Sequence, residues 1–156
     1  MKVNGRAQQG LFVMLMLALQ RDHRPVSSAT LAAVLDVSDA YLKKTLTTMV
    51  GAGLVRAVQG RDGGYVLARP LADVTIADVV RALDPMETPD ACDALARAVY
   101  GSSDHLESTL SMIHAVFHEA DGDWLARLST VPLSALVIPE AAEHGAIDWR
   151  ERASRS

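Results

Sequence analysis

The sequence predicts a mainly α-helical protein with one small β-hairpin, arranged as a winged helix-turn-helix domain plus a long C-terminal dimerisation helix. Three observations carry this prediction. Two helical patterns are separated only by the short stretch Asp36-Val37-Ser38. A glycine-rich stretch, QGRDGGYVL at 59–67, lies between the apolar runs VRAV and YVLA, which is typical of a hairpin. An apolar stripe with helix-pairing spacing then follows Ser103.

Composition narrows the classes of protein that this chain can be. Its 156 residues suffice for one domain with an apolar core, or for a compact domain with an extension. The chain has one cysteine, Cys92, which excludes an internal disulfide framework and a thiolate cage for zinc or an iron–sulfur cluster within one chain. The longest apolar run, residues 11–19, is shorter than the roughly 20 residues that a membrane-spanning helix needs. We therefore expect a cytoplasmic protein without a membrane span.

Charge is distributed unevenly along the chain. The formal net charge is −4, yet residues 1–84 carry ten Lys/Arg against seven Asp/Glu, and residues 85–156 carry five against twelve. Within 39–61 there are four basic side chains and a single acid. The position of charge matters more than its sum for nucleic-acid binding, so the first half is the candidate for that function.

Two helices are predicted before the turn. The first covers residues 3–20, ahead of Arg24-Pro25, and is expected to enter the core through Leu11, Leu15 and Leu19. The second begins at Ser27 or Ser28, because either side chain can cap a helix N-terminus. Its core residues are expected to be Leu31, Val34 and Leu35.

The third helix, Asp39 to Val50 with Ser38 as its cap, has two distinct faces. One face carries Leu42, Leu46 and Met49 at helical spacing. The opposite face carries small, hydroxylated and basic side chains, namely Ala40, Lys43, Lys44, Thr47 and Thr48. Such residues suit a close approach to phosphates and base edges. An ordinary solvated face is the alternative for a helix taken alone.

The hairpin and a fourth helix complete the domain. Strands are expected at Leu54–Val58 and Tyr65–Arg69, with the turn permitted by Gly60, Gly63 and Gly64. A helix from Thr75 to Leu83 is expected to begin with a Thr75/Asp78 capping pair. This turn is not a phosphate-binding loop, because a strand follows it and not a helix N-terminus.

The sequence predicts four parts in all: a DNA-binding domain over 1–84, a linker with a short helix over 85–101, a dimerisation helix and packing segment over 102–138, and a flexible tail over 139–156. The helix carries Leu106, Leu110, Ile113 and Phe117 at spacings of 4, 3 and 4. We favour pairing with a second copy over folding back on the same chain. The role of Trp149 in the tail is left open.

The run from Ser28 to Leu83 resembles the Rrf-two-type family of bacterial winged-helix transcription regulators. That family includes the iron–sulfur cluster regulator, the nitric-oxide-sensing repressor and the cysteine-metabolism repressor. The matching stretches are LAAVLDVSDAYLKKTL, AGLVRAVQGRDGGYVLARP and VTIADVVRALD. The resemblance implies a homodimer that binds double-stranded operator DNA, with a recognition helix in the major groove and a glycine-rich wing in the minor groove.

The resemblance also implies which residues contact DNA. They are Ser28, Ser38, Ala40, Tyr41, Lys43, Lys44, Thr47, Arg56, Gln59, Gly60 and Arg61. Family members usually carry arginine where this chain has Gln59. The nearest arginine here, Arg61, is two positions further into the turn, so affinity or sequence preference is expected to differ.

Many family members hold an iron–sulfur cluster with three cysteines, whereas this chain has only Cys92. We therefore expect a clusterless branch without cofactor or metal, which responds to an unknown small-molecule or redox signal. Cys92 is a candidate redox sensor; the alternative is an unreactive residue, since Asp90 and Asp93 would raise the pKa of its thiol. His114 and His118, one helical turn apart, form a weaker candidate for metal binding.

The absence of a nucleophile motif, a phosphate loop or an HExxH sequence indicates that the protein is not an enzyme. Taken together, the sequence predicts a homodimeric transcription regulator, most simply a repressor. The alternative is a winged-helix scaffold that has lost DNA binding, in keeping with the acidic total charge and with Gln59.

Overall fold

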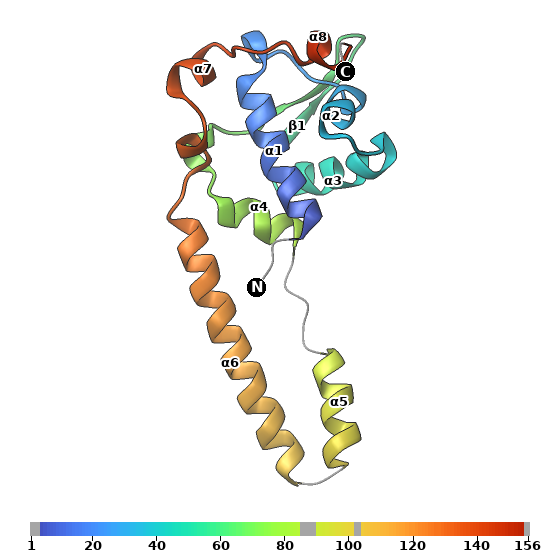
Figure 1. Ribbon diagram of the computed structural model, residues 1–156, viewed down its shortest axis with the longest axis vertical. Coiled ribbons are helices and arrows are strands. Elements are labelled where there is room, and N and C mark those ends of the chain that lie inside the picture. The colour runs from blue at the N-terminus through green and yellow to red at the C-terminus, as the bar shows by residue number, and fades with distance from the viewer. Residues whose placement is uncertain (1–3, 85–89, 102–103, 155–156) are drawn as a thin grey trace. The chain divides into compact units, whose positions relative to one another are not determined.

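The computed structural model describes residues 4–84, 90–101 and 104–154 (Figure 1). The chain divides into two compact units, one made of Met1–Pro85 with Ser129–Ser156 and the other of Met86–Leu128. The described part is mostly helical and contains one two-stranded antiparallel sheet, which confirms the predicted fold class. No helix in the described residues is long and apolar enough to cross a membrane.

The first unit contains most of the elements. In chain order they are α1 (Gly5–Leu19), η1 (Arg21–His23), α2 (Ser28–Leu35), α3 (Asp39–Gly51), β1 (Val55–Val58), β2 (Gly64–Leu67), η2 (Leu71–Asp73), α4 (Ile76–Leu83), η3 (Leu133–Leu136), α7 (Pro139–Glu143) and α8 (Trp149–Ala153). The second unit contains α5 (Asp90–Tyr100) and α6 (Asp104–Ser129).

Helix α1 lies at the centre of the first unit and packs against α3 and α4. The prediction of its buried face was wrong, because Leu11, Leu15 and Leu19 are only half-buried. The buried side of the helix consists of Ala7, Gly10, Val13, Met14, Met16, Leu17 and Ala18. Residues 11–19 are apolar on nearly every side, so helical spacing alone does not single out the face that meets α4.

The helix-turn-helix is built from local capping contacts. Ser27 caps α2 by accepting a hydrogen bond from the Thr30 N–H, and Ser38 caps α3 by accepting one from the Tyr41 N–H. Between them, Asp36 takes the left-handed conformation, with φ of 52°. A side chain that tolerates this conformation allows the sharp change of direction between the helices. The predicted Ser38 cap is confirmed, and Ser27 rather than Ser28 caps α2.

The hairpin is fastened to the helix-turn-helix through its backbone. Val55 to Val58 of β1 pair with Leu67 to Gly64 of β2 in antiparallel register. The Tyr65 N–H donates to the Val26 carbonyl at 2.8 Å, and the Val26 N–H donates to the Tyr65 carbonyl at 3.0 Å. Val26 lies just ahead of α2. The second strand of the hairpin therefore holds the approach to the helix-turn-helix in place.

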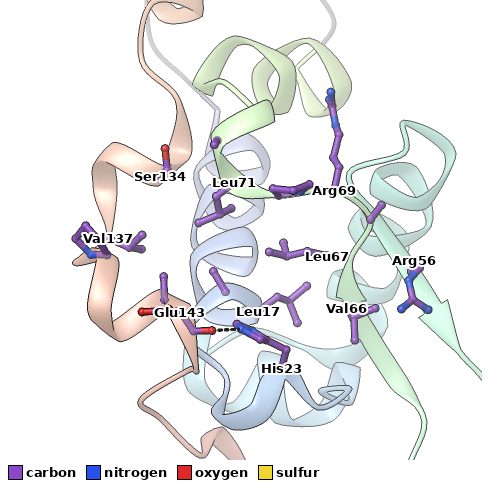
Figure 2. Close-up of a pocket in the computed structure, with 16 residues that line it drawn as sticks. Leu17, His23, Arg56, Val66, Leu67, Arg69, Leu71, Ser134, Val137 and Glu143 are labelled. Carbon is purple, nitrogen blue, oxygen red and sulfur yellow. Dashed lines mark hydrogen bonds between the residues drawn. The ribbon is translucent and has the colours of Figure 1, made fainter.

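Helix α4 starts with the predicted capping box, in which Thr75 and Asp78 bond each other's backbone N–H groups. The segment after α6 attaches beside this cap. The Leu133 N–H donates to the Val74 carbonyl at 2.8 Å, and Leu133 is fully buried. Residues from 129 onward therefore belong with the first unit, in contrast to the predicted division that joined 102–138 in one part. From there the chain passes alongside α1 (Figure 2).

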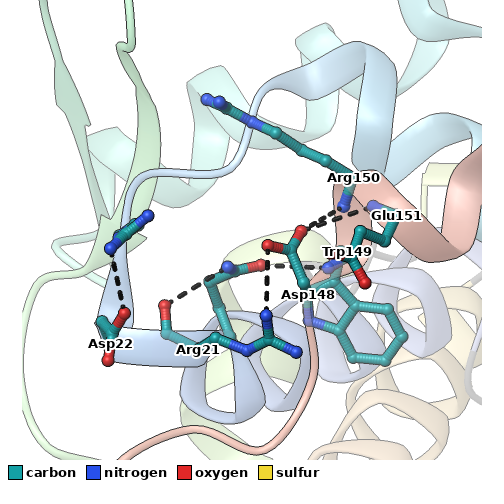
Figure 3. A network of polar contacts seen from close by, with 8 residues as sticks. Arg21, Asp22, Asp148, Trp149, Arg150 and Glu151 are labelled. Carbon is teal, nitrogen blue, oxygen red and sulfur yellow. Dashed lines mark hydrogen bonds and ion pairs between the residues drawn. The ribbon is translucent and has the colours of Figure 1, made fainter.

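Residues 139–154 differ from the predicted flexible tail over 139–156, because α7 and α8 form and contacts with α1 hold them. Trp149 is only 6% exposed, and its indole N–H donates to the Met16 carbonyl at 2.7 Å. Its backbone N–H donates to the Gln20 side chain (Figure 3). Burial of a large aromatic side chain, with its polar edge satisfied, fixes a segment that looks polar in sequence.

The second unit is a pair of helices with a small apolar cluster of Ala96, Leu106 and Leu110. The predicted seam of α6 is buried only at its first half. Phe117 is 59% exposed, and Met112 is 71% exposed.

Gly64 offers a test of the hairpin attachment. A Cβ at Gly64 would collide with the backbone of Val26, so we expect Gly64→Ala to lower the free energy of unfolding by about 1–3 kcal/mol. Gly51→Ala is the matched control, because a Cβ there meets nothing within 4 Å; we expect it to raise stability by about 0.5 kcal/mol. Urea denaturation measures both. Equal stability of the two variants would contradict the close packing of Gly64.

Candidate nucleic-acid interface

Helix α3 presents a polar face outward because its apolar face is committed to the core. Leu42, Leu46 and Met49 are fully buried in the core of the first unit, as predicted. The residues predicted to contact DNA from this helix are all exposed, namely Ala40, Tyr41, Lys43, Lys44 and Thr47, and Ser38 is exposed at its start. The structure thus brings these side chains together on one accessible surface, which we call the α3 face.

The two lysines of the α3 face differ in their surroundings. The Lys43 ammonium lies 2.7 Å from the Asp39 carboxylate, one helical turn earlier. The Lys43 ammonium holds the pKa of Asp39 below its ordinary value, and the carboxylate in turn raises the pKa of Lys43. No acidic group in the described residues pairs with Lys44. Lys44 is therefore the less neutralised cation of the helix.

Ser28 was predicted to contact DNA, but it is only 8% exposed. Its hydroxyl contributes to lowering the pKa of Asp39, after the larger effect of Lys43. Ser28 is the first residue of α2, and its burial leaves little surface for a ligand.

Arg6 is a basic residue outside the predicted interface. Its guanidinium donates to the Thr48 hydroxyl at 2.5 Å and to the Lys44 carbonyl at 3.4 Å. Arg6 lies in the first turn of α1, so its proximity to α3 arises only when the two helices cross. It adds positive charge beside the C-terminal half of the α3 face.

The hairpin tip carries the other predicted contacts, namely Gln59, Gly60 and Arg61, which are all exposed. Gly60 has a φ of 118°, which a residue with a Cβ rarely adopts, and the Gly63 N–H closes the turn onto the Gly60 carbonyl. Arg56 is exposed on β1, opposite Val66. We call residues 55–67 the wing.

A second unassigned basic residue meets the wing tip from the end of the chain. The Arg150 guanidinium of α8 lies 3.7 Å from the carboxylate of Asp62. Asp62 is the acid of the QGRDGG turn, and its charge would oppose an approaching phosphate. No sequence signal pairs these two residues, which are far apart in the chain; Arg150 follows Trp149, whose indole N–H donates to the Met16 carbonyl.

The predicted sensor and metal candidates lie in the second unit. Cys92 is in α5, but its side chain is outside the described residues. The His114 imidazole lies 3.0 Å from the Asp93 carboxylate, while His118 is exposed. No group of three or more potential metal-ligating side chains is found within the described ranges.

Comparison with known proteins places the chain among transcription regulators. The profile of the Rrf2 family, described as iron-dependent transcriptional regulator, matches residues 3–139. YwgB of Bacillus subtilis, named an HTH-type transcriptional regulator, is 30% identical over 80% of this chain and 76% of its own length. CymR of the same organism is 32% identical, over 57% of this chain and 64% of its own length. IscR of Photorhabdus laumondii is 26% identical, over 88% of this chain and 79% of its own length.

Solved structures with the same fold extend the comparison. CymR of B. subtilis, described as its global cysteine regulator, superposes with a TM-score of 0.57 at 24% identity, over 87% of this chain and 95% of that chain. IscR of T. potens superposes with a TM-score of 0.62 at 24% identity, over 94% of this chain and 92% of that chain. A transcriptional regulator from Lactobacillus plantarum gives 0.70 at 19% identity, over 96% of both chains. At these identities the likeness concerns the fold alone.

The iron named in the family description does not fit the ligands that this chain offers. A cluster or iron site built on thiolates needs several cysteines, and the chain contains only Cys92. The His114–Asp93 contact in the second unit supplies two ligands at most. We therefore derive no function through iron.

Asp39 provides a test of the α3 face as a DNA interface. Asp39→Asn releases Lys43 and removes the negative charge from the face, so we expect DNA affinity to rise by roughly threefold to tenfold. The slope of log binding constant against log salt concentration should become steeper, by the amount that about one additional phosphate contact produces. The thermal stability should fall slightly, because an acid in the first turn favours the helix.

Fluorescence anisotropy at several salt concentrations measures the binding, and Asp73→Asn, at an exposed acid on η2, is the charge-matched control. An equal gain in affinity for both variants would mean that only net charge matters.

Proposed function

Because the chain belongs to the Rrf2 family of transcriptional regulators, we propose that it acts as a homodimeric, sequence-specific repressor. In this proposal α3 enters the major groove of an operator and the wing reaches the adjacent minor groove. The observation that carries the proposal is the exposed α3 face, on which Lys43, Lys44 and Thr47 lie beside a wing held to the same unit. Basic and hydroxylated side chains at this position match the way a recognition helix reads DNA.

Lys44 is the proposed base reader of the α3 face. It has no acidic partner among the described residues, whereas Lys43 is paired with Asp39. Lys43 would then serve mainly to attract phosphate. Tyr41, which is 42% exposed, and Ala40 supply the apolar surface that can meet a thymine methyl group.

In this proposal the wing contributes less to DNA affinity than it would with an arginine at position 59. Gln59 can hydrogen-bond in the minor groove without charge, and Arg61 and Arg56 supply phosphate attraction on either side. Pairing of Asp62 with Arg150 reduces the repulsion that the tip would otherwise exert on the backbone of DNA.

Homodimerisation is supported by the apolar side chains that the second unit leaves exposed. Those on the two helices are Leu95, Val99, Tyr100, Met112, Val116 and Phe117. A unit of two helices cannot bury so many apolar groups by itself, and exposed apolar patches of this kind mark interfaces. A second copy would cover them with an equivalent surface and set the spacing between two recognition helices.

Selection of bound sequences from random DNA is the experiment that tests the proposal. We expect an enriched two-fold symmetric site whose half-sites are about one helical turn apart. A reporter fused to that site should be silenced when the protein is expressed. Failure to enrich any sequence, even at low salt, would favour a scaffold role, and activation of the reporter would exclude the repressor.

Lys44→Ala tests the assignment of the base reader. We expect a loss of about 1–3 kcal/mol in binding to the selected site, with relaxed preference at one base position per half-site. Arg97→Ala, at an exposed basic residue of α5, is the control and should leave the sequence preference unchanged. A loss that is equal for all DNA sequences would place Lys44 on phosphate instead.

Phe117→Asp tests the dimer. A carboxylate placed in an apolar interface would have to be desolvated, so we expect the dimer dissociation constant to rise at least tenfold. Sedimentation equilibrium measures it. Ser111→Asp adds the same charge at an exposed polar position of α6 and should leave the dimer intact. A dimer that tolerates Phe117→Asp would exclude this part of α6 from the interface.

A further inference from the structure

A cavity of about 700 Å³ lies beneath the chain segment that follows α6, within the first unit (Figure 2). Hydrogen bonds from Leu133 to Val74 and from Ile76 to Val131 fasten one end of this segment. The other end is fastened where the Ile147 N–H donates to the Leu19 carbonyl and the Arg21 N–H donates to the Ile147 carbonyl. We call residues 134–143 the strap, because they span the cavity between two anchored ends.

The walls of the cavity are mainly apolar. Leu17 of α1, Leu67 of β2 and Leu71 of η2 form the side facing the strap, and Val137 approaches from the strap itself (Figure 2). At the lower end the His23 imidazole lies 3.1 Å from the Glu143 carbonyl (Figure 2). Pockets that hold drug-sized ligands have roughly 300–1,000 Å³ and apolar walls with a few polar groups, so both size and lining suit a small organic molecule.

Positive charge is placed at one side of this apolar space. Arg56 and Arg69 both line the cavity. Arg69 is already engaged, because it donates to the Asp73 carbonyl at 3.1 Å and lies 4.0 Å from the Asp78 carboxylate. Arg56 pairs with no acidic group in the described residues. The acid of the lining, Glu143, belongs to the strap at the far end, beside His23.

From this arrangement we infer that the cavity under the strap binds a small amphipathic anion, with its apolar body among Leu17, Leu67 and Leu71 and its anionic head at Arg56. A carboxylate or sulfonate would supply the partner that Arg56 lacks. Neutral apolar molecules of the same size would fill the same walls but leave the guanidinium unpaired, so they bind more weakly.

The cavity is connected to the wing through β2. Val66 and Leu67 of β2 line it, followed by Ala68, and the same strand leads from the wing tip and pairs Val66 with Arg56 of β1. On the proposed function, Arg56 attracts phosphate; a bound anion occupies that guanidinium and withdraws it from DNA. The ligand therefore acts as an inducer that lowers operator affinity, and this regulatory step rests on the proposed function.

Binding is tested directly with the full-length protein and two probes. Anilinonaphthalene sulfonate, an apolar dye with one anionic group, should bind saturably at one site per chain in the cavity. Decanoate should displace it, and decanol should need a concentration about tenfold higher. Arg56→Gln should weaken decanoate at least tenfold while leaving decanol unchanged.

Filling the cavity provides the matched comparison. Ala72→Trp places a large side chain at an exposed alanine of the lining, whereas Ala135→Trp places it at an exposed alanine of η3 outside the lining. We expect Ala72→Trp to abolish decanoate binding and Ala135→Trp to retain it. Ala142→Trp, from the strap side, should also abolish it; circular dichroism verifies that each variant is folded.

The inference is overturned if decanoate does not bind. It is also overturned if folded Ala72→Trp and Ala142→Trp bind decanoate and the dye as the wild type does, because both ligands would then bind the exposed surface of α5 and α6. If a second copy of the chain fills the cavity, decanoate will not bind, and this result also overturns the inference. DNA binding without any ligand tests the proposed function separately. If the protein binds decanoate but no DNA, the ligand site stands and the proposed repressor function is refuted. If operator affinity is unchanged with decanoate bound, only the regulatory step is refuted.

Discussion

The reciprocal backbone hydrogen bonds between Val26 and Tyr65 are the constraint on which the rest of the interface depends. A two-stranded hairpin by itself is marginal in water, so the wing needs an outside attachment to keep one position. The attachment point lies directly before α2, whose packing against α3 sets the direction of the recognition face. Gly64 makes this possible, because its missing side chain lets the strand approach the Val26 backbone. One short contact thus makes the wing and the α3 face parts of a single surface.

Electrostatics explains how a chain of net negative charge can still bind DNA. The acids that lie within the interface are each matched with a cation, Asp39 with Lys43 at 2.7 Å and Asp62 with Arg150 at 3.7 Å. Such exposed pairs add little to stability. In the proposed interface they leave Lys44, Arg56 and Arg61 as exposed cations without an acidic partner in the described residues. Neutralising local acids thereby matters more for DNA than the charge of the whole chain.

The sequence was sufficient for features that depend on neighbouring residues. The Ser38 cap, the Thr75/Asp78 capping box, the hairpin and the buried face of α3 were all predicted, because each follows from spacing within a few residues. Features that depend on distant contacts were missed. The buried face of α1 is set by α4, the position of Arg6 is set by α3, and the order of the tail is set by Trp149 against Met16. The inward position of Ser28 likewise follows from the packing of α2 on α3.

The order of the C-terminal tail changes what the family likeness can say about regulation. The Rrf2 profile ends at residue 139, whereas the strap continues to Glu143 and is held by contacts of residues 144–149 with the end of α1. Trp149 and Ile147 thus anchor one end of the segment that spans the cavity, and Val131 and Leu133 anchor the other end. Since β2 forms both a wall of that cavity and one side of the wing, a ligand bound there as proposed would touch the strand that carries the wing. In the proposed mode of sensing, this apolar cavity and the Arg56 guanidinium, which has no acidic partner in the described residues, couple a ligand to the wing without iron.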